Sequence, residues 1–154
     1  MLRVGDKMPD FELPNQDNEI VRLSDYRGKK IVLFAFPMAG TPECTKQACI
    51  YRDTYEDFAQ NNTVILGITG NPTTALRKWR DHHNFPYDLL SDNQHTLLDE
   101  LGSWGQPIVA GIELPIAKRS FWVIDEEGII IEAQIGSDAT TSVQASLAFI
   151  QETA

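Results

Sequence analysis

At 154 residues, the chain has the length of one domain, which we expect to cover 1–154 and to bury roughly 70% of its unfolded surface. Its 22 acidic and 13 basic side chains give a formal net charge of −9, which repels a phosphate backbone and argues against nucleic acid as a partner. No signal-peptide core and no apolar run of the roughly 18 residues typical of a membrane span is found, so we expect a soluble, cytoplasmic protein without a membrane partner.

The first half of the chain is predicted to alternate strands with helices. A β-hairpin is expected within residues 13–23, and continuous apolar runs at 31–36 and 63–68 are typical of strands covered on both faces. A helix between these two runs would complete a β-α-β crossover. The apolar stripe of that helix is predicted to consist of Cys44, Ala48, Tyr51, Tyr55 and Phe58.

Two further helices are predicted before the pattern changes. One begins after residues 70–72, with Leu76 and Trp79 facing inward, and the next lies near 93–101. The first of these would pack against the sheet, because its inward residues recur at helical spacing.

The last third of the sequence has a period of two and then returns to helical spacing. Strands are predicted at 119–125 and 129–135, joined by a turn at Glu127 and Gly128. The final helix has an apolar face formed by Val143, Leu147 and Ile150. No repeat, linker or low-complexity tract interrupts the chain, so these elements predict an α/β fold in one packed unit.

The chain contains only two cysteines, Cys44 and Cys49. Two cysteines in a reducing compartment are more often catalytic, redox-active or metal-binding than structural. Thr41 suits a helix N-cap and Pro42 the first helical position, which makes Cys44 the third helical residue. There the helix dipole and an amide without an intrahelical acceptor favour a thiolate. Such a cysteine is suited to reaction, although a buried free cysteine also serves as a small hydrophobic residue.

The spacing of the two cysteines places them apart on a helix. Five residues correspond to a rotation of about 140° and a Cα separation of about 8.6 Å. A disulfide needs Cα atoms within about 7 Å, so a Cys44–Cys49 bond would require this part of the helix to unwind. The neighbours of Cys49 on its helix face are polar, which predicts that the helix releases it easily; they are Thr45, Arg52, Asp53 and Glu56.

The residues around Cys44 resemble the active-site motif of peroxiredoxins. Pro37-x-x-x-Thr41-x-x-Cys44 has the form of that motif, and the step to Cys49 is similar to the peroxiredoxin Q subfamily, also called bacterioferritin comigratory protein. Further matching segments lie at 5–13, 89–92 and 119–125. The resemblance covers nearly the whole chain and implies a thioredoxin-like fold, with a central mixed sheet flanked by helices and an N-terminal hairpin.

The resemblance also implies roles for individual residues. Cys44 would be the peroxidatic cysteine and Cys49 the resolving cysteine, with Pro37, Thr41 and Arg119 completing the pocket. Hydrogen peroxide or an organic hydroperoxide would oxidise Cys44 to a sulfenic acid, which Cys49 would convert to an intramolecular disulfide. Thioredoxin or a similar dithiol would then reduce the disulfide. The expected protein is an antioxidant monomer that needs no cofactor and no metal.

Two other functions remain open at this stage. A general dithiol-disulfide oxidoreductase is the first, although the sequence lacks the C-x-x-C motif of that class. A redox-sensing module is the second, in which the same thiol pair would switch a partner protein.

Many relatives have glycine where Glu43 stands, and a carboxylate beside Cys44 disfavours its thiolate unless the carboxylate is exposed to water.

The remaining charged and metal-ligating residues are assigned to the surface. His82 and His83 are adjacent in a predicted helix and cannot face the same side, and His95 is distant in sequence, so solvated histidines are expected rather than a metal site. Arg52 could join Arg119 near the pocket, but a surface pair with a neighbouring carboxylate is favoured.

Overall fold

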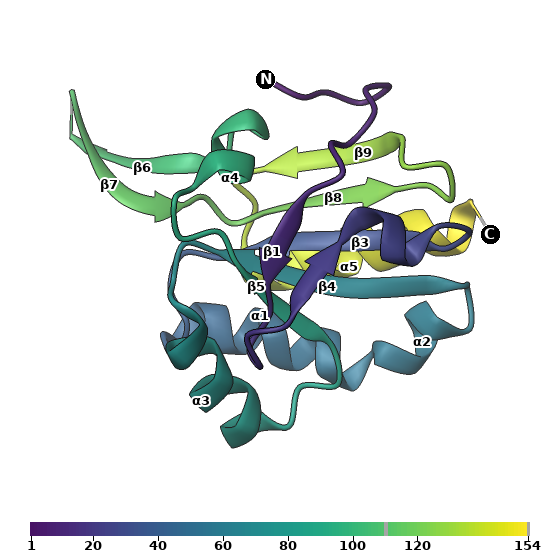
Figure 1. The fold of residues 1–154 in the computed structure, drawn as a ribbon, viewed down its shortest axis with the longest axis horizontal. Coiled ribbons are helices and arrows are strands. Elements are labelled where there is room, and N and C mark those ends of the chain that lie inside the picture. The colour runs from purple at the N-terminus through teal and green to yellow at the C-terminus, as the bar shows by residue number, and fades with distance from the viewer. Residues whose placement is uncertain (110, 154) are drawn as a thin grey trace.

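The computed structural model describes residues 1–109 and 111–153 (Figure 1). Its central five-stranded sheet has the order β5-β4-β3-β8-β9, in which β3, β4 and β5 run parallel and β8 and β9 run antiparallel. The strands are β3 (Lys30–Ala35), β4 (Thr63–Thr69), β5 (Asp88–Ser91), β8 (Ser120–Ile124) and β9 (Ile130–Ile135). This mixed sheet confirms the predicted α/β class.

Both faces of the sheet are covered, because successive side chains of a strand point to opposite faces. Val32 and Phe34 of β3 enter one hydrophobic cluster, whereas Ile31, Leu33 and Ala35 enter the other. The first cluster is covered by α1 (Pro42–Asp53), α2 (Tyr55–Ala59), α3 (Thr73–His83) and α5 (Ala139–Glu152). The second is covered by the N-terminal segment and α4 (Thr96–Glu100).

The predicted N-terminal hairpin is confirmed. It consists of β1 (Glu12–Pro14) and β2 (Ile20–Arg22), which pair antiparallel, and a 3-10 helix, η1 (Leu23–Tyr26), follows it. Figure 1 shows α5 behind the sheet and the hairpin in front of it. Among residues 1–109 and 111–153, every helix is too short or too polar to cross a membrane.

Two predicted helices are shorter than expected. The stripe that begins at Cys44 does not run through one helix, because Thr54 interrupts it between α1 and α2. The Thr54 hydroxyl and amide both donate to the carbonyl of Ile50, a side-chain contact of the kind that bends helices. Helix α4 begins only at Thr96, because His95 has a left-handed backbone conformation with φ +50° that cannot continue a helix in the N-terminal direction.

The sequence predicts no strand between residues 105 and 118. The segment contains β6 (Trp104–Val109) and β7 (Ile112–Ala117), which pair as an antiparallel arm that projects from one end of the sheet (Figure 1). Its prolines disguised the strands, because proline is confined to edge strands and bulges and argues against a central strand. Ala110, at the tip of the segment, lies outside the described residues.

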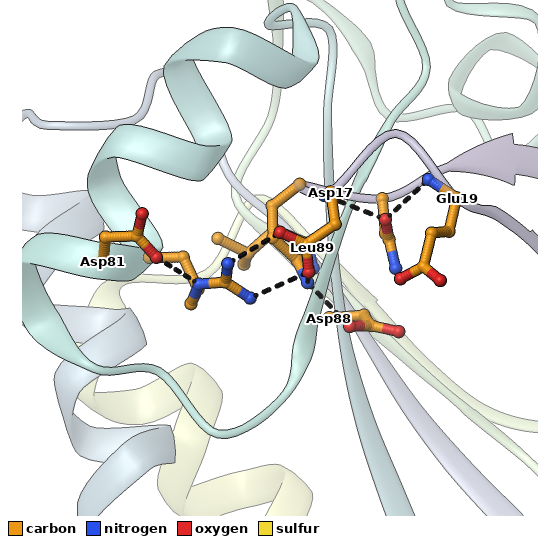
Figure 2. Close-up of polar contacts among 8 residues, drawn as sticks. Asp17, Glu19, Asp81, Asp88 and Leu89 are labelled. Carbon is orange, nitrogen blue, oxygen red and sulfur yellow. Dashed lines mark hydrogen bonds and ion pairs between the residues drawn. The ribbon is translucent and has the colours of Figure 1, made fainter.

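A polar network fastens the loop between β1 and β2 to α3 and β5 (Figure 2). Arg80 donates to both carboxylate oxygens of Asp17, at 3.2 and 2.7 Å. The buried Gln16 accepts from the Leu89 amide and donates to Asp88, both at 2.8 Å. We call this set the hairpin-loop network; its members are Asn15, Gln16, Asp17, Glu19, Arg80, Asp81, Asp88 and Leu89. The network links the hairpin loop to α3 and β5, and we call this connected part of the molecule the frame.

Candidate active site

The loop after β3 delivers Cys44 to the first turn of α1, as predicted. Thr41 is the N-cap residue, with extended backbone angles, and Pro42 occupies the first helical position. The Thr41 side chain does not cap the helix, however. Its hydroxyl donates to the carbonyl oxygen of Met38 at 2.8 Å. Because a hydroxyl has a single proton, the outward lone pairs of Thr41 can only accept a further hydrogen bond in this arrangement.

Arg119 lies against the sulfur of Cys44. Its Nη2 donates to Cys44 Sγ at 3.5 Å, although the two residues are 75 positions apart in the sequence. The Arg119 carbonyl accepts from the amides of Gly136 and Ser137, so the end of β9 holds the arginine backbone in place. Cys44 is 1% exposed. The guanidinium places a permanent positive charge and a hydrogen-bond donor beside the sulfur, since arginine stays charged.

Gln47 belongs to the same site, and the sequence analysis missed it. Its Oε1 accepts from Arg119 Nη1 at 2.6 Å, and its Nε2 donates to Ser142 Oγ of α5 at 3.2 Å. The side chain is fully buried, so both polar ends need partners. Gln47 therefore orients the guanidinium that contacts Cys44. Its position three residues after Cys44, on the same helix face, was the available signal.

Pro37 and the residues after it are tied to the end of β4 and the loop that follows. The amide of Phe36 donates to Ile68 O at 3.2 Å, and Thr69 Oγ1 lies 3.5 Å from Pro37 O. The Ala39 amide donates to Asn71 Oδ1 at 2.7 Å. Pro37 is half-buried at the start of this loop. Pro37, Thr41 and Cys44 thus share one connection, from β3 into α1, and Arg119 joins them from the segment before β8.

Cys49 is not brought to Cys44, and both cysteines are free thiols. The neighbours of Cys49 on its helix face are polar, as predicted, but the residue is half-buried and also packs against the first hydrophobic cluster. Burial raises the pKa of the Cys49 thiol, and the nearby positive charge of Arg52 partly offsets this effect. Burial therefore lowers the thiolate fraction of Cys49 while the helix is intact.

Two charged residues near the cysteines are turned away from the site. Glu43 is exposed to solvent, so its carboxylate is hydrated and screened. Arg52 pairs with Asp53 at 3.0 Å, as the surface interpretation predicted, and also donates to the carbonyl of His83 at 2.9 Å. Arg52 therefore links α1 to the C-terminal end of α3.

The histidines are less solvated than expected. Only His82 is exposed, while His83 stacks on Phe85 with ring centroids 5.3 Å apart, and burial lowers the pKa of His83. His95 stacks on Trp104 at 4.3 Å and bonds Asp99 at 2.6 Å. Within the described part of the chain, no group of three or more histidine, cysteine or carboxylate side chains could hold a metal ion.

Comparison with solved structures places the fold among thioredoxin-like peroxiredoxins. The crystal structure of peroxidoxin BcpB from Mycobacterium tuberculosis superposes with a TM-score of 0.88 at 32% identity, covering 99% of this chain and 98% of that one. Peroxiredoxin Q of Xylella fastidiosa superposes with a TM-score of 0.92 over 99% of this chain and 98% of that one; its 18% identity supports the fold alone.

Sequence comparison then establishes the family. The model of the AhpC/TSA family matches residues 4–133. Peroxiredoxin Bcp of Bacillus subtilis is 39% identical over 131 residues, which cover 85% of this chain and 83% of that protein. Peroxiredoxin Bcp of Escherichia coli is 33% identical over 129 residues, covering 84% and 83%. The chain belongs to the AhpC/TSA family and is a thiol-dependent peroxidase.

Proposed function

We propose that Cys44 reduces hydrogen peroxide and organic hydroperoxides, that Cys49 resolves the resulting sulfenic acid as an intramolecular disulfide, and that thioredoxin or a similar dithiol reduces this disulfide. One observation supports the assignment of the nucleophile above all. The Sγ of Cys44 lies in the first turn of α1 and 3.5 Å from Arg119 Nη2, an arrangement that favours a reactive thiolate.

In the first step, the Cys44 thiolate attacks one oxygen of the peroxide in line with the O–O bond. That bond breaks as the S–O bond forms, so the sulfur is oxidised to sulfenic acid and the peroxide leaves as water or an alcohol after taking a proton. The Thr41 oxygen can accept the O–H of the incoming peroxide, because its own proton is directed to Met38 O. Arg119 and the Cys44 amide donate to the oxygens, and Pro37 shields the sulfur from bulk water.

In the second step, the thiol of Cys49 condenses with the sulfenic acid and releases water. On an intact helix the two Cα atoms are about 8.6 Å apart, so the first turns of α1 must unwind for this bond to form. Unwinding also returns Cys49 to water. Its raised pKa, a consequence of burial, then falls toward the ordinary value, and the thiolate needed for condensation becomes accessible.

We further propose that residues 1–154 act as one domain and as a monomer in the cytoplasm. Both hydrophobic clusters pack on one sheet, which supports a single unit. Two free thiols suit the reducing conditions of the cytoplasm.

Consumption of hydrogen peroxide with thioredoxin, thioredoxin reductase and NADPH tests this proposal. We expect many turnovers per enzyme and none for Cys44→Ser, which removes the nucleophile and changes little volume. Turnover by Cys44→Ser close to that of the unmodified protein would refute the assignment of Cys44. A single stoichiometric burst that the reductant does not renew would instead support a redox-sensing module.

A further inference from the structure

The peptide group between Met38 and Ala39 is hydrogen-bonded on both sides by side chains. Its carbonyl oxygen, on Met38, accepts the Thr41 hydroxyl at 2.8 Å, and its N–H, on Ala39, donates to Asn71 Oδ1 at 2.7 Å. A trans peptide is planar, so its C=O and N–H point in opposite directions and move together. Asn71 therefore helps to set the direction of the carbonyl that orients the Thr41 hydroxyl, and the Thr41 amide contacts the same carbonyl at a longer 3.4 Å.

Asn71 is itself well supported. It lies in the short connection between β4 and α3, and its carbonyl accepts the hydroxyl of Ser91 from the end of β5 at 2.5 Å. The contact of Asn71 with Ala39 is also shorter than the other ties of this loop to the β4 side, which measure 3.2 Å from Phe36 N to Ile68 O and 3.5 Å from Thr69 Oγ1 to Pro37 O.

We infer that Asn71 is a positioning residue for peroxide reduction and acts through the Met38–Ala39 peptide on Thr41. The inference rests on the proposed peroxidase chemistry of Cys44 and adds a residue to it. With its proton directed to Met38 O, Thr41 presents its lone pairs to the O–H of the peroxide. Without Asn71, the peptide is held only on its carbonyl side, by Thr41 itself, and the orientation of the Thr41 hydroxyl is less fixed.

The hydrogen bonds of Asn71 are separate from those of the residues that contact the Cys44 sulfur. Arg119 bonds Gln47 and Cys44, whereas Asn71 bonds Ala39 and Ser91. Loss of the Asn71 side-chain oxygen should therefore slow the reaction of Cys44 with peroxide but leave its reaction with iodoacetamide unchanged, since alkylation needs the thiolate but no oriented Thr41. A general loosening of the site would change both reactions.

The first experiment measures both rates in a Cys49→Ser background, in which Cys44 is the single thiol. Asn71→Leu has nearly the shape of asparagine but no acceptor, and Asn71→Asp keeps the acceptor. We expect Asn71→Leu to lower the rate constant for hydrogen peroxide about 10-fold and to leave alkylation unchanged, while Asn71→Asp retains most of the peroxide rate. Asn93→Leu, at an exposed asparagine in the connection between β5 and α4, is the matched control and should change neither rate.

Equal losses in the two reactions, or an Asn71→Asp variant as slow with peroxide as Asn71→Leu, would overturn the inference. Thermal unfolding monitors the fold of each variant. If leucine prevents folding, Asn71→Ala removes the same acceptor without added bulk and replaces it in both measurements.

A double-mutant cycle with Thr41→Val shows whether Asn71 affects the peroxide rate through Thr41. Removal of the Thr41 hydroxyl should lower the peroxide rate about 100-fold, and Asn71→Leu should add nothing in that background because its effect passes through Thr41. Effects that multiply would show that Asn71 acts elsewhere and would contradict the inference. A different result, no oxidation of Cys44 by peroxide in the parent protein, would contradict the proposed function itself.

Discussion

Two regions that contact α3 are held in opposite ways. In the hairpin-loop network, the Gln16 side chain bonds Asp17, Asp88 and the Leu89 amide, and Arg80 bonds both oxygens of Asp17 (Figure 2). The Cys44 region is held by contacts from several separate elements: Asn71 bonds Ala39, Trp79 bonds Thr45, and Arg119 bonds both Cys44 and Gln47, which in turn bonds Ser142 of α5. The first arrangement is one compact cluster around a single loop, whereas the second depends on contacts with separate elements, which have to be released together when α1 unwinds.

Helix α3 links the two regions. Its Arg80 faces the hairpin loop, while its Trp79 donates to Thr45 of α1 at 3.2 Å and the carbonyl of His83 accepts from Arg52 of α1 at 2.9 Å. We therefore expect α1 to unwind against a frame that stays in place, and to return to the same position when the disulfide is reduced. Four predictions test this contrast, from the largest expected effect to the smallest.

Cys49→Ser should stop turnover while sparing the first chemical step. The variant should reduce one equivalent of hydrogen peroxide and then remain as a Cys44 sulfenic acid, which further peroxide converts to sulfinic acid. Mass spectrometry after stepwise addition of peroxide measures these products. Continued thioredoxin-dependent turnover by Cys49→Ser would show that the second cysteine is not required.

Arg119→Met should slow peroxide reduction strongly, because it removes the cation 3.5 Å from the sulfur and a donor to the peroxide oxygens. We expect the rate constant for hydrogen peroxide to fall about 100-fold. Stopped-flow measurement of Cys44 oxidation tests this expectation, with Arg77→Met, an exposed arginine of α3, as the control. A rate unchanged by Arg119→Met would remove Arg119 from the reaction.

Gln16→Ala should weaken the frame and spare the chemistry. It leaves the buried Leu89 amide without its acceptor, which lowers the free energy of unfolding by about 2 kcal/mol. For a protein of this size the melting temperature should fall by about 4–8 °C, while the rate of Cys44 oxidation stays unchanged. Glu19→Ala, which removes an exposed side chain of the same loop, should have little effect on either quantity. Loss of peroxide reactivity in folded Gln16→Ala would remove the contrast between the two regions.

The labelling of Cys49 should depend on pH in a way that reports its burial. In Cys44→Ser, Cys49 is the single thiol, and its pKa is raised by burial, so a smaller fraction is thiolate at each pH than for an exposed cysteine. The pH profile of labelling by iodoacetamide should therefore be displaced upward relative to the same protein in urea. Coincident profiles would show that α1 does not shield Cys49.

The parts of the fold predicted from sequence depend on local patterns. The apolar runs predicted β3 and β4, and Thr41 with Pro42 predicted the start of α1, because buried strands and helix caps have short-range signatures. The resemblance to peroxiredoxins linked Arg119 to Cys44, a contact across 75 positions that no periodic pattern encodes.

The missed features either depend on contacts between distant segments or have a weak local pattern. Gln47 contacts Arg119 across 72 positions, and Asn71 contacts Ala39 across 32, so neither role is visible in local spacing. Asn71 was noted only for its place before a helix. The arm of β6 and β7 was missed because its prolines conceal an edge ribbon, for which the strand pattern is weak.

Hydrogen exchange of the reduced and disulfide forms tests the central claim most directly, that α1 unwinds while its frame does not. The mass of the intact protein first confirms that the Cys44–Cys49 disulfide has formed. Deuterium uptake of proteolytic peptides then reports on α1, on the strands and on the hairpin-loop network. We predict faster exchange for amides 44–52 in the disulfide form and little change in β3, β4 and residues 15–19. Equal protection of 44–52 in both forms would contradict the claim that the helix opens to bring the two cysteines together.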